Sequence, residues 1–310
     1  MRSVLLSFSL AALLLLCSCQ KNISVGVKLD SKLSSYVPPA ATLLAGVDAD
    51  SLKATPFYAR HQNQLNVPAL HDMAEQVGVD LRRDLSSALV AWQAGSPVIL
   101  ARGRFNAADI EPHLVSLGSK RSEYRRQALF AKDGQSLFFP ERNIVVGGPS
   151  PAIRELIDHK HGGIPQPLID RLRQLPKSAQ VWIVSSQGLP LGRIPVRSDV
   201  ESALSNIVAY VSGINAGVTF DEGAHVHADL LCISAEDARQ VHDALRGGIG
   251  LARLTTKDNQ LELLKLYDAI QVSYEQQTVH IHADLSAQLA DQLVGLASGL
   301  GGRAGQLLSR

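Results

Sequence analysis

A hexapeptide that alternates polar and apolar side chains occurs twice in the C-terminal third of the chain, as HVHADL from residue 225 and as HIHADL from residue 280. Because alternate residues of a β-strand share a face, each copy places two imidazoles and one carboxylate on one side of its strand. Imidazole nitrogens and carboxylate oxygens are ligands of zinc and copper. The candidate metal ligands are His225, His227, His280 and His282.

The same pattern is also typical of a solvated strand face whose opposite, apolar face packs against helices. The first copy lies three residues further from the Ser that follows it than the second does, Ser234 against Ser286. An odd offset turns a strand over unless a bulge intervenes. In the strand order expected below, the two strands are not neighbours. Both points favour the solvated face over a zinc or copper site, so we expect no cofactor.

The histidines also predict a response to acid. Protonation between pH 7 and pH 5 would place like charges on each His-x-His face, because an unperturbed imidazole titrates near pH 6.5. If this repulsion lowers the pKa values of the histidines in the folded state, stability decreases as the pH falls.

Recognisable catalytic motifs are absent from the sequence, which has no G-x-S-x-G, no H-E-x-x-H and no C-x-x-C. Cys232 lies within an apolar run of leucine and isoleucine, where a buried, unreactive thiol is the usual state. The sequence therefore favours a non-catalytic binding or scaffold protein. A hydrolase with a triad assembled in space stays open as an alternative.

The N-terminus has the pattern of an export signal, predicted over residues 1–18. Arg2 precedes the uncharged run Val4–Leu16, which is too short to cross a bilayer core of about 30 Å as a helix. The following Leu16-Cys17-Ser18-Cys19 resembles the lipobox of bacterial lipoproteins. The resemblance implies that Cys19 is acylated, for instance with palmitate, and becomes the first residue of a lipid-anchored chain. Gln20 in the next position implies the outer membrane, with the protein facing the periplasm.

Charge and cysteine content restrict the partners. The chain has 30 Lys and Arg against 29 Asp and Glu, and the signal removes only Arg2. With balanced charge and 5% aromatic residues, we expect no nucleic-acid partner. The expected partners are the membrane, through the lipid, and an envelope protein or a small ligand. Cys17 leaves with the signal and Cys19 is lipidated, so no intramolecular disulfide is expected and packing must stabilise the fold.

An apolar strand followed by a capping residue and an amphipathic helix recurs four times. Ser, Asn and Pro suit the first positions of a helix. The predicted strand-to-helix units run over 98–117, 144–157, 226–245 and 279–296. The connections Gly95-Ser96-Pro97, Asp133-Gly134 and Asp221-Glu222-Gly223 predict hairpins, and therefore antiparallel pairing.

These units combine into two similar halves after a polar stretch. We expect a flexible tether over 19–36, a first α+β unit over 37–174 and a second over 175–310, with the boundary in the Gly- and Pro-containing segment 162–176. Each unit is predicted to be an antiparallel sheet with helices on one face, close to the split βαβ or ferredoxin-like plan. The two units are interpreted as tandem copies that arose by duplication.

The segment Val37–Val47, with Leu52 and Thr55-Pro56 after it, resembles the opening of uncharacterised exported bacterial lipoproteins with a duplicated α+β domain. The likeness implies an exported α+β protein and carries no activity. The function predicted from the sequence is therefore that of an envelope-tethered binding or scaffold protein. The alternatives are a metal-binding envelope protein that uses the His-x-His strands, or a hydrolase.

Overall fold

The computed structural model describes residues 26–64, 77–93, 95–159, 162–188, 207–257 and 259–295. The predicted signal over 1–18, the lipidation residue Cys19 and the first part of the expected tether lie outside these ranges. Within them, no helix is both long enough and apolar enough to span a bilayer.

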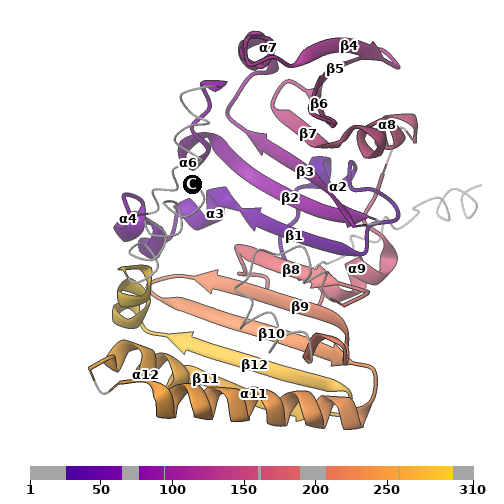
Figure 1. Cartoon of the computed structure of the whole chain (residues 1–310). Helices are drawn as coiled ribbons and strands as arrows, with labels where there is room; N and C mark the ends of the chain where they lie inside the picture. The colour runs from indigo at the N-terminus through magenta and orange to yellow at the C-terminus, as the bar shows by residue number, and fades with distance from the viewer. Residues whose placement is uncertain are drawn as a thin grey trace, which may run out of the picture.

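One antiparallel sheet runs through the whole described chain, with the N-terminal half at the top of Figure 1 and the C-terminal half at the bottom. Its 12 strands follow the order β11-β12-β10-β9-β8-β1-β2-β3-β7-β6-β5-β4. The strands are β1 (Leu43–Asp48), β2 (Leu85–Gln93), β3 (Ser96–Gly103), β4 (Lys120–Tyr124), β5 (Gln127–Lys132), β6 (Gln135–Glu141), β7 (Ile144–Pro149), β8 (Val181–Ser185), β9 (Val211–Phe220), β10 (Ala224–Cys232), β11 (Ile270–Glu275) and β12 (Thr278–Leu285). The α+β class and the antiparallel sheet predicted from the sequence are confirmed.

Helices connect or flank these strands. They are α2 (Ser31–Ser34), α3 (Ala49–Lys53), α4 (Pro56–His61), α6 (Leu81–Asp84), α7 (Ala107–Ser116), α8 (Ser150–Asp158), α9 (Gln166–Leu172), α11 (Ala235–Thr255) and α12 (Leu261–Ala269). Three of the predicted caps are confirmed, because the side chains of Asn106, Ser234 and Ser286 accept hydrogen bonds from the first-turn N–H groups of α7, of α11 and of the helix that begins at Ala287. At α8 the capping residue is Pro149, and no side chain caps the helix.

The two halves share a strand order. β1-β2-β3-β7-β6 in the first half has the same sequence of connections as β8-β9-β10-β12-β11 in the second. In the first half, β3 and β6 run in the same direction, with the antiparallel strand β7 between them. In the second half, β10 and β11 run in the same direction, with the antiparallel strand β12 between them. Each half therefore contains a split βαβ element, as predicted, but in the second half the inserted strand is β12, which lies next to β10, contrary to the strand order expected from the sequence. That the halves arose by duplication stays a prediction.

The halves are not separate units, because β1 and β8 pair along their length and fuse them into one sheet. The segment expected to be a boundary contains α9, whose Leu168 and Leu172 are buried in the main core together with Leu44 and Val184. The predicted division at residue 174 therefore does not separate two cores. A hairpin edge left open by either half alone would expose unpaired backbone groups, and the β1–β8 pairing removes that edge.

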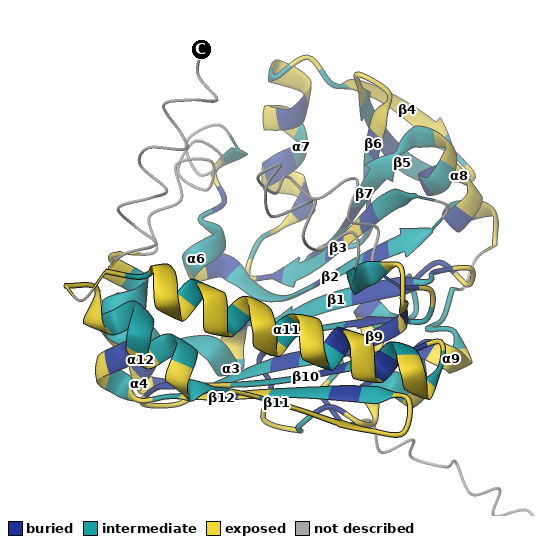
Figure 2. Cartoon of the chain, turned by 60° about the horizontal axis from the view of Figure 1, so that its bottom comes forward, coloured by how far each residue is buried: buried dark blue, intermediate teal, exposed yellow. Residues whose placement is uncertain are grey.

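Helices cover both faces of the sheet, so the prediction of helices on one face is wrong. On β5, Leu129 belongs to the main core with Ile153 of α8, whereas the adjacent Phe130 packs with Ile110 of α7. Consecutive strand residues point to opposite faces, so α7 and α8 lie on opposite sides. In the second half, α11 crosses the face that carries Val279 and presents its outer side to solvent (Figure 2).

The N-terminal segment is part of the fold from residue 27 onward. Val27, Leu33 and Val37 are at most 2% exposed and lie in the main core. The tether predicted over 19–36 is therefore wrong for its second half. One side of the segment contacts the sheet, and Lys28 and Lys32 on the other side are exposed to solvent. This alternation is too short to be recognised in the sequence as a periodic pattern.

Candidate functional site

The two hexapeptides lie side by side on β10 and β12, contrary to the strand order expected from the sequence. Their antiparallel register opposes His225 to Asp284, His227 to His282 and Asp229 to His280. Because the pattern His-x-His-x-Asp pairs with its own reverse, each outer imidazole meets a carboxylate and the two central imidazoles meet each other. We call these six residues the His–Asp ladder.

One carboxylate at the protected end of the ladder holds two imidazoles. Asp229 Oδ1 lies 2.7 Å from His280 Nδ1, and Asp229 Oδ2 lies 3.1 Å from His227 Nε2. The Asp229 side chain is only 12% exposed, against 24% for His227 and 31% for His280. A buried carboxylate needs such donors, so both imidazoles direct an N–H toward it.

The central pair consists of two imidazoles that are hydrogen-bonded to each other through their Nδ1 atoms. His227 Nδ1 and His282 Nδ1 are 3.2 Å apart, with ring centroids at 4.6 Å and planes inclined at 48°. Since Nε2 of His227 donates to Asp229, its Nδ1 carries a lone pair in the neutral ring.

His225, at the exposed end, has a carboxylate at each nitrogen. Nδ1 lies 2.7 Å from Asp284 Oδ1 and Nε2 lies 3.0 Å from Asp221 Oδ2. These hydrogen bonds, first that of Asp284 and then that of Asp221, raise the pKa of His225. This direction is opposite to the lowered pKa values on which the predicted loss of stability in acid depends. Carboxylates of the paired strand counter the electrostatic repulsion that was expected within each His-x-His pair.

The face that carries the ladder is open beyond α9. His225, His282 and Asp284 are exposed, and so are Gln271, Ser273 and Glu275 on the neighbouring edge strand. The opposite face of the same strands is covered by α11 and α12. The sequences of β9, β10, β11 and β12 contain no Lys or Arg, so the charges that these strands bring to the open face are those of carboxylates and imidazoles.

The four predicted metal ligands therefore share one face but do not converge on one point. His225 and His280 turn to carboxylates, and only His227 and His282 face each other. Across the ranges that the structure describes, no group of three or more His, Cys, Asp or Glu side chains is arranged to hold a metal ion.

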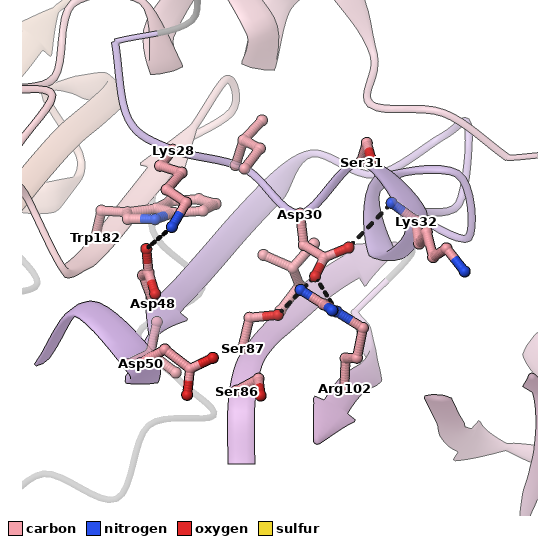
Figure 3. Close-up of a pocket in the computed structure, with 13 residues that line it drawn as sticks. Lys28, Asp30, Ser31, Lys32, Asp48, Asp50, Ser86, Ser87, Arg102 and Trp182 are labelled. Atoms are coloured by element: carbon pink, nitrogen blue, oxygen red, sulfur yellow. Dashed lines mark hydrogen bonds and ion pairs between the residues drawn. The ribbon is translucent and has the colours of Figure 1, made fainter. Parts of the chain in front are cut away.

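A second polar site, which the sequence analysis missed, is a cavity of about 300 Å³ where the N-terminal segment crosses β1, β2 and β3 (Figure 3). Its charged lining consists of Lys28, Asp30, Lys32, Asp48, Asp50 and Arg102, and Trp182 closes one side. Gly46 leaves room for that indole, because a Cβ there would stand 2.3 Å from Trp182 Cζ2.

Two ion pairs lie within this cavity, Lys28 with Asp48 and Asp30 with Arg102, while Lys32 pairs with Glu141 and Asp50 with Lys53 outside its lining. Asp30, 5% exposed, forms an ion pair with Arg102, accepts hydrogen bonds from the N–H groups of Lys32 and Leu33 at the start of α2, and accepts another from Ser87 at 3.0 Å. Burial alone would raise the pKa of Asp30, but the hydrogen bonds from Leu33, Arg102 and Ser87 outweigh it and lower the pKa. The cavity therefore works as a clamp on the N-terminal segment. An aspartate that precedes a short amphipathic stretch was the one sequence signal for it.

The histidine ring nitrogens of the described chain pair with carboxylates, with amide or backbone oxygens and with another imidazole. No hydroxyl or thiol there is hydrogen-bonded to a histidine ring nitrogen, the contact that activates a serine or cysteine nucleophile. Cys232 is a free, buried thiol, as the sequence predicted, and burial raises its pKa.

No protein-family model and no curated protein sequence matches the chain. Among solved structures, crystal form III of TP0453, a Treponema lipoprotein, matches with a TM-score of 0.50 and 10% identity over 86% of this chain and 99% of that one. Crystal form I of the same protein matches with a TM-score of 0.46 and 10% identity over 88% and 98%. At this identity the likeness to crystal form III shows the fold alone.

Proposed function

We propose that this is a lipid-anchored protein of the cell envelope that binds a ligand without catalysis, through the open sheet face that carries the His–Asp ladder. The observation that carries the proposal is the contrast between this face and the rest of the sheet. α8, α9 and the N-terminal segment cover the same side of the neighbouring strands, whereas on β10, β12 and β11 this side carries mainly polar side chains, of which His225, His282, Asp284, Gln271, Ser273 and Glu275 are exposed.

The folding of the N-terminal segment onto the sheet supports a body held close to its membrane. If Cys19 carries the lipid, eight residues lead from it to Val27, which lies in the main core. Fully extended, they reach about 28 Å. The ladder would then work within a short distance of the bilayer, on the periplasmic side of the outer membrane in our proposal, where an envelope protein or a small ligand is the partner.

The state of the imidazoles supports binding over hydrolysis. Each ladder histidine has a carboxylate or another imidazole as its partner, and no hydroxyl or thiol of the described chain lies against one. Acyl transfer needs a base that is hydrogen-bonded to its nucleophile, and the ladder pairs its imidazoles with carboxylates and with each other.

The anchor is tested by labelling cells with radioactive palmitate. The wild type and the Cys17→Ser variant should incorporate label, and the Cys19→Ser variant should not. Label retained by Cys19→Ser would place the lipid elsewhere and contradict the anchoring proposal.

The binding face is tested by photo-crosslinking in intact cells. A crosslinking amino acid at Gln271, which is exposed beside the ladder, should give a defined adduct. The same amino acid at Glu123, exposed on β4 at the far edge of the sheet, is the matched control and should give none. Equal adducts at both positions, or none at either, would contradict binding through this face.

A further inference from the structure

We infer that His227 and His282 form a two-imidazole site for one divalent late transition metal ion, in the order Cu²⁺ ahead of Ni²⁺ and Zn²⁺. The inference deepens the proposed function, on which it rests for the open face, by naming a chemical class of ligand. The other positions of the ion would be filled by water or by a ligand group from outside.

The distance between the two rings suits a shared ion. Metal–imidazole nitrogen bonds are about 2.0–2.1 Å long, so two nitrogens on one ion stand roughly 2.9 Å apart at a right angle and about 3.4 Å apart at a tetrahedral angle. The Nδ1 atoms of His227 and His282 are 3.2 Å apart, between these values. The two nitrogens are thus at the spacing that one ion requires.

The backbone holds this spacing. His227 and His282 are directly opposed near the middle of the β10–β12 pairing, with paired residues on both sides. On the other side of His227, the opposed residue of β9 is Gly217, which places no side chain beside the imidazole. Ordered strands limit the rearrangement that binding requires.

Asp229 supplies the orienting contact that metal-binding histidines have. A histidine ligand commonly donates its second N–H to a carboxylate, which fixes the ring and increases its basicity. Asp229 Oδ2 accepts from Nε2 of His227 at 3.1 Å, while its other oxygen is held by His280 at 2.7 Å. His280 is therefore a positioning residue for Asp229, and Asp229 for His227.

The electrostatic setting favours a cation. The ladder carries two carboxylates, Asp229 and Asp284, and Asp221 and Glu275 lie nearby on the same side. None of the four surrounding strands contributes a Lys or Arg. Binding is balanced in protons: the proton between the two Nδ1 atoms leaves His282, and Nε2 of that exposed ring takes one up from solvent.

The order of metals follows from the donors. Two imidazoles suit Cu²⁺, Ni²⁺ and Zn²⁺, and at a site of given donors the affinity rises toward Cu²⁺. A site with only two protein ligands leaves the ion accessible, which agrees with the exposed position of His282.

The test is titration of the intact lipoprotein, purified in detergent without a histidine tag, with CuCl₂ and with ZnCl₂. Calorimetry should give one ion per chain, and electron paramagnetic resonance of the Cu²⁺ form should show two imidazole nitrogens. His282→Gln, at an exposed position, should weaken binding at least roughly tenfold, and Asp229→Asn should weaken it by roughly 10–100-fold. His225→Gln is the matched control, because it removes an imidazole of the same face and leaves the pair intact.

Thermal melts of each variant separate loss of binding from loss of folding. The inference is overturned if the wild type binds no Cu²⁺ at about 100 µM, or if the double variant His227→Gln/His282→Gln binds as tightly as the wild type. It is also overturned if His225→Gln loses affinity as much as His282→Gln does. The crosslink at Gln271 is read separately: if it persists while metal binding is absent, only the metal inference fails.

Discussion

The ion pair between Asp30 and Arg102 clamps the N-terminal segment to the sheet, and Arg102→Met removes it while keeping most of the side-chain volume. The side chain of Asp30 is 5% exposed and that of Arg102 is 37% exposed. Loss of the guanidinium would leave a buried carboxylate without a counter-charge, the change that makes broken ion pairs costly.

The expected loss is about 2 kcal/mol in the free energy of unfolding at pH 7. Breaking a fully buried pair costs roughly 3–5 kcal/mol, and a hydrogen bond to a charged group contributes roughly 1.5–3 kcal/mol. The lower part of this range applies, because Arg102 is partly hydrated and Asp30 keeps its bonds from Lys32, Leu33 and Ser87.

The pH dependence provides a second, independent readout. The pKa of Asp30 is lowered in the folded protein, so its stabilising contribution is present above the unfolded pKa of about 3.9 and is lost as the pH falls through the folded value. Wild type and variant should therefore differ most at pH 7, and the difference should shrink below about pH 4 as the carboxylate is protonated in both.

Urea unfolding at pH 7 and at pH 3.5 measures both effects, with limited proteolysis to detect release of the segment that contains Val27 and Leu33. The matched control is Arg121→Met, whose exposed pair with Glu111 spans 3.9 Å and should contribute less than about 0.5 kcal/mol. A loss at Arg102 no larger than at Arg121, or one independent of pH, would refute the clamp.

Two further changes test the sheet and the ladder. Gly46→Ala should destabilise the protein by roughly 1–3 kcal/mol, because its Cβ would meet the indole of Trp182, whereas Gly163→Ala, with open space around its Cβ, should leave the melting temperature unchanged. His225→Gln should lower stability by less than about 1 kcal/mol, since the imidazole is 46% exposed. A raised pKa stabilises the folded state below the unfolded value and loses this effect as the pH rises through the folded one, so the loss should be seen at about pH 6 and vanish by about pH 9. A larger loss at the higher pH would contradict the assigned partners.

Local sequence signals predicted the individual elements well. The two-residue turn at Asp133 and Gly134 has positive φ at both positions, as its residue types require, and joins β5 to β6. Ser234 caps α11 where expected. α11 continues ten residues beyond the predicted end at Leu245, because Gly247, Gly248 and Gly250 are tolerated inside the helix.

The sequence could not show which strands would be neighbours. Both hexapeptides were visible, and so was the shared face within each copy. The two copies are neighbours because the β11–β12 hairpin folds back so that β12, and not β11, pairs with β10. The pairing joins residues far apart in the chain, such as His227 and His282, and Val279 and Val272 pack with Val241 of α11 on the opposite face.

By itself, the sequence predicted the α+β class, the antiparallel hairpins and the buried thiol of Cys232, because each depends on a few adjacent residues or on composition; the export and lipidation pattern has the same local basis and stays a prediction. Only the tertiary structure decided that the two halves share one sheet, that residues 27–37 belong to the core, and that His227 faces His282. Those features arise from pairing between β1 and β8, from apolar burial across the first half and from the register of β10 on β12. The physical reason is that such long-range contacts are selected by burial and backbone pairing of the whole sheet, which no local pattern encodes.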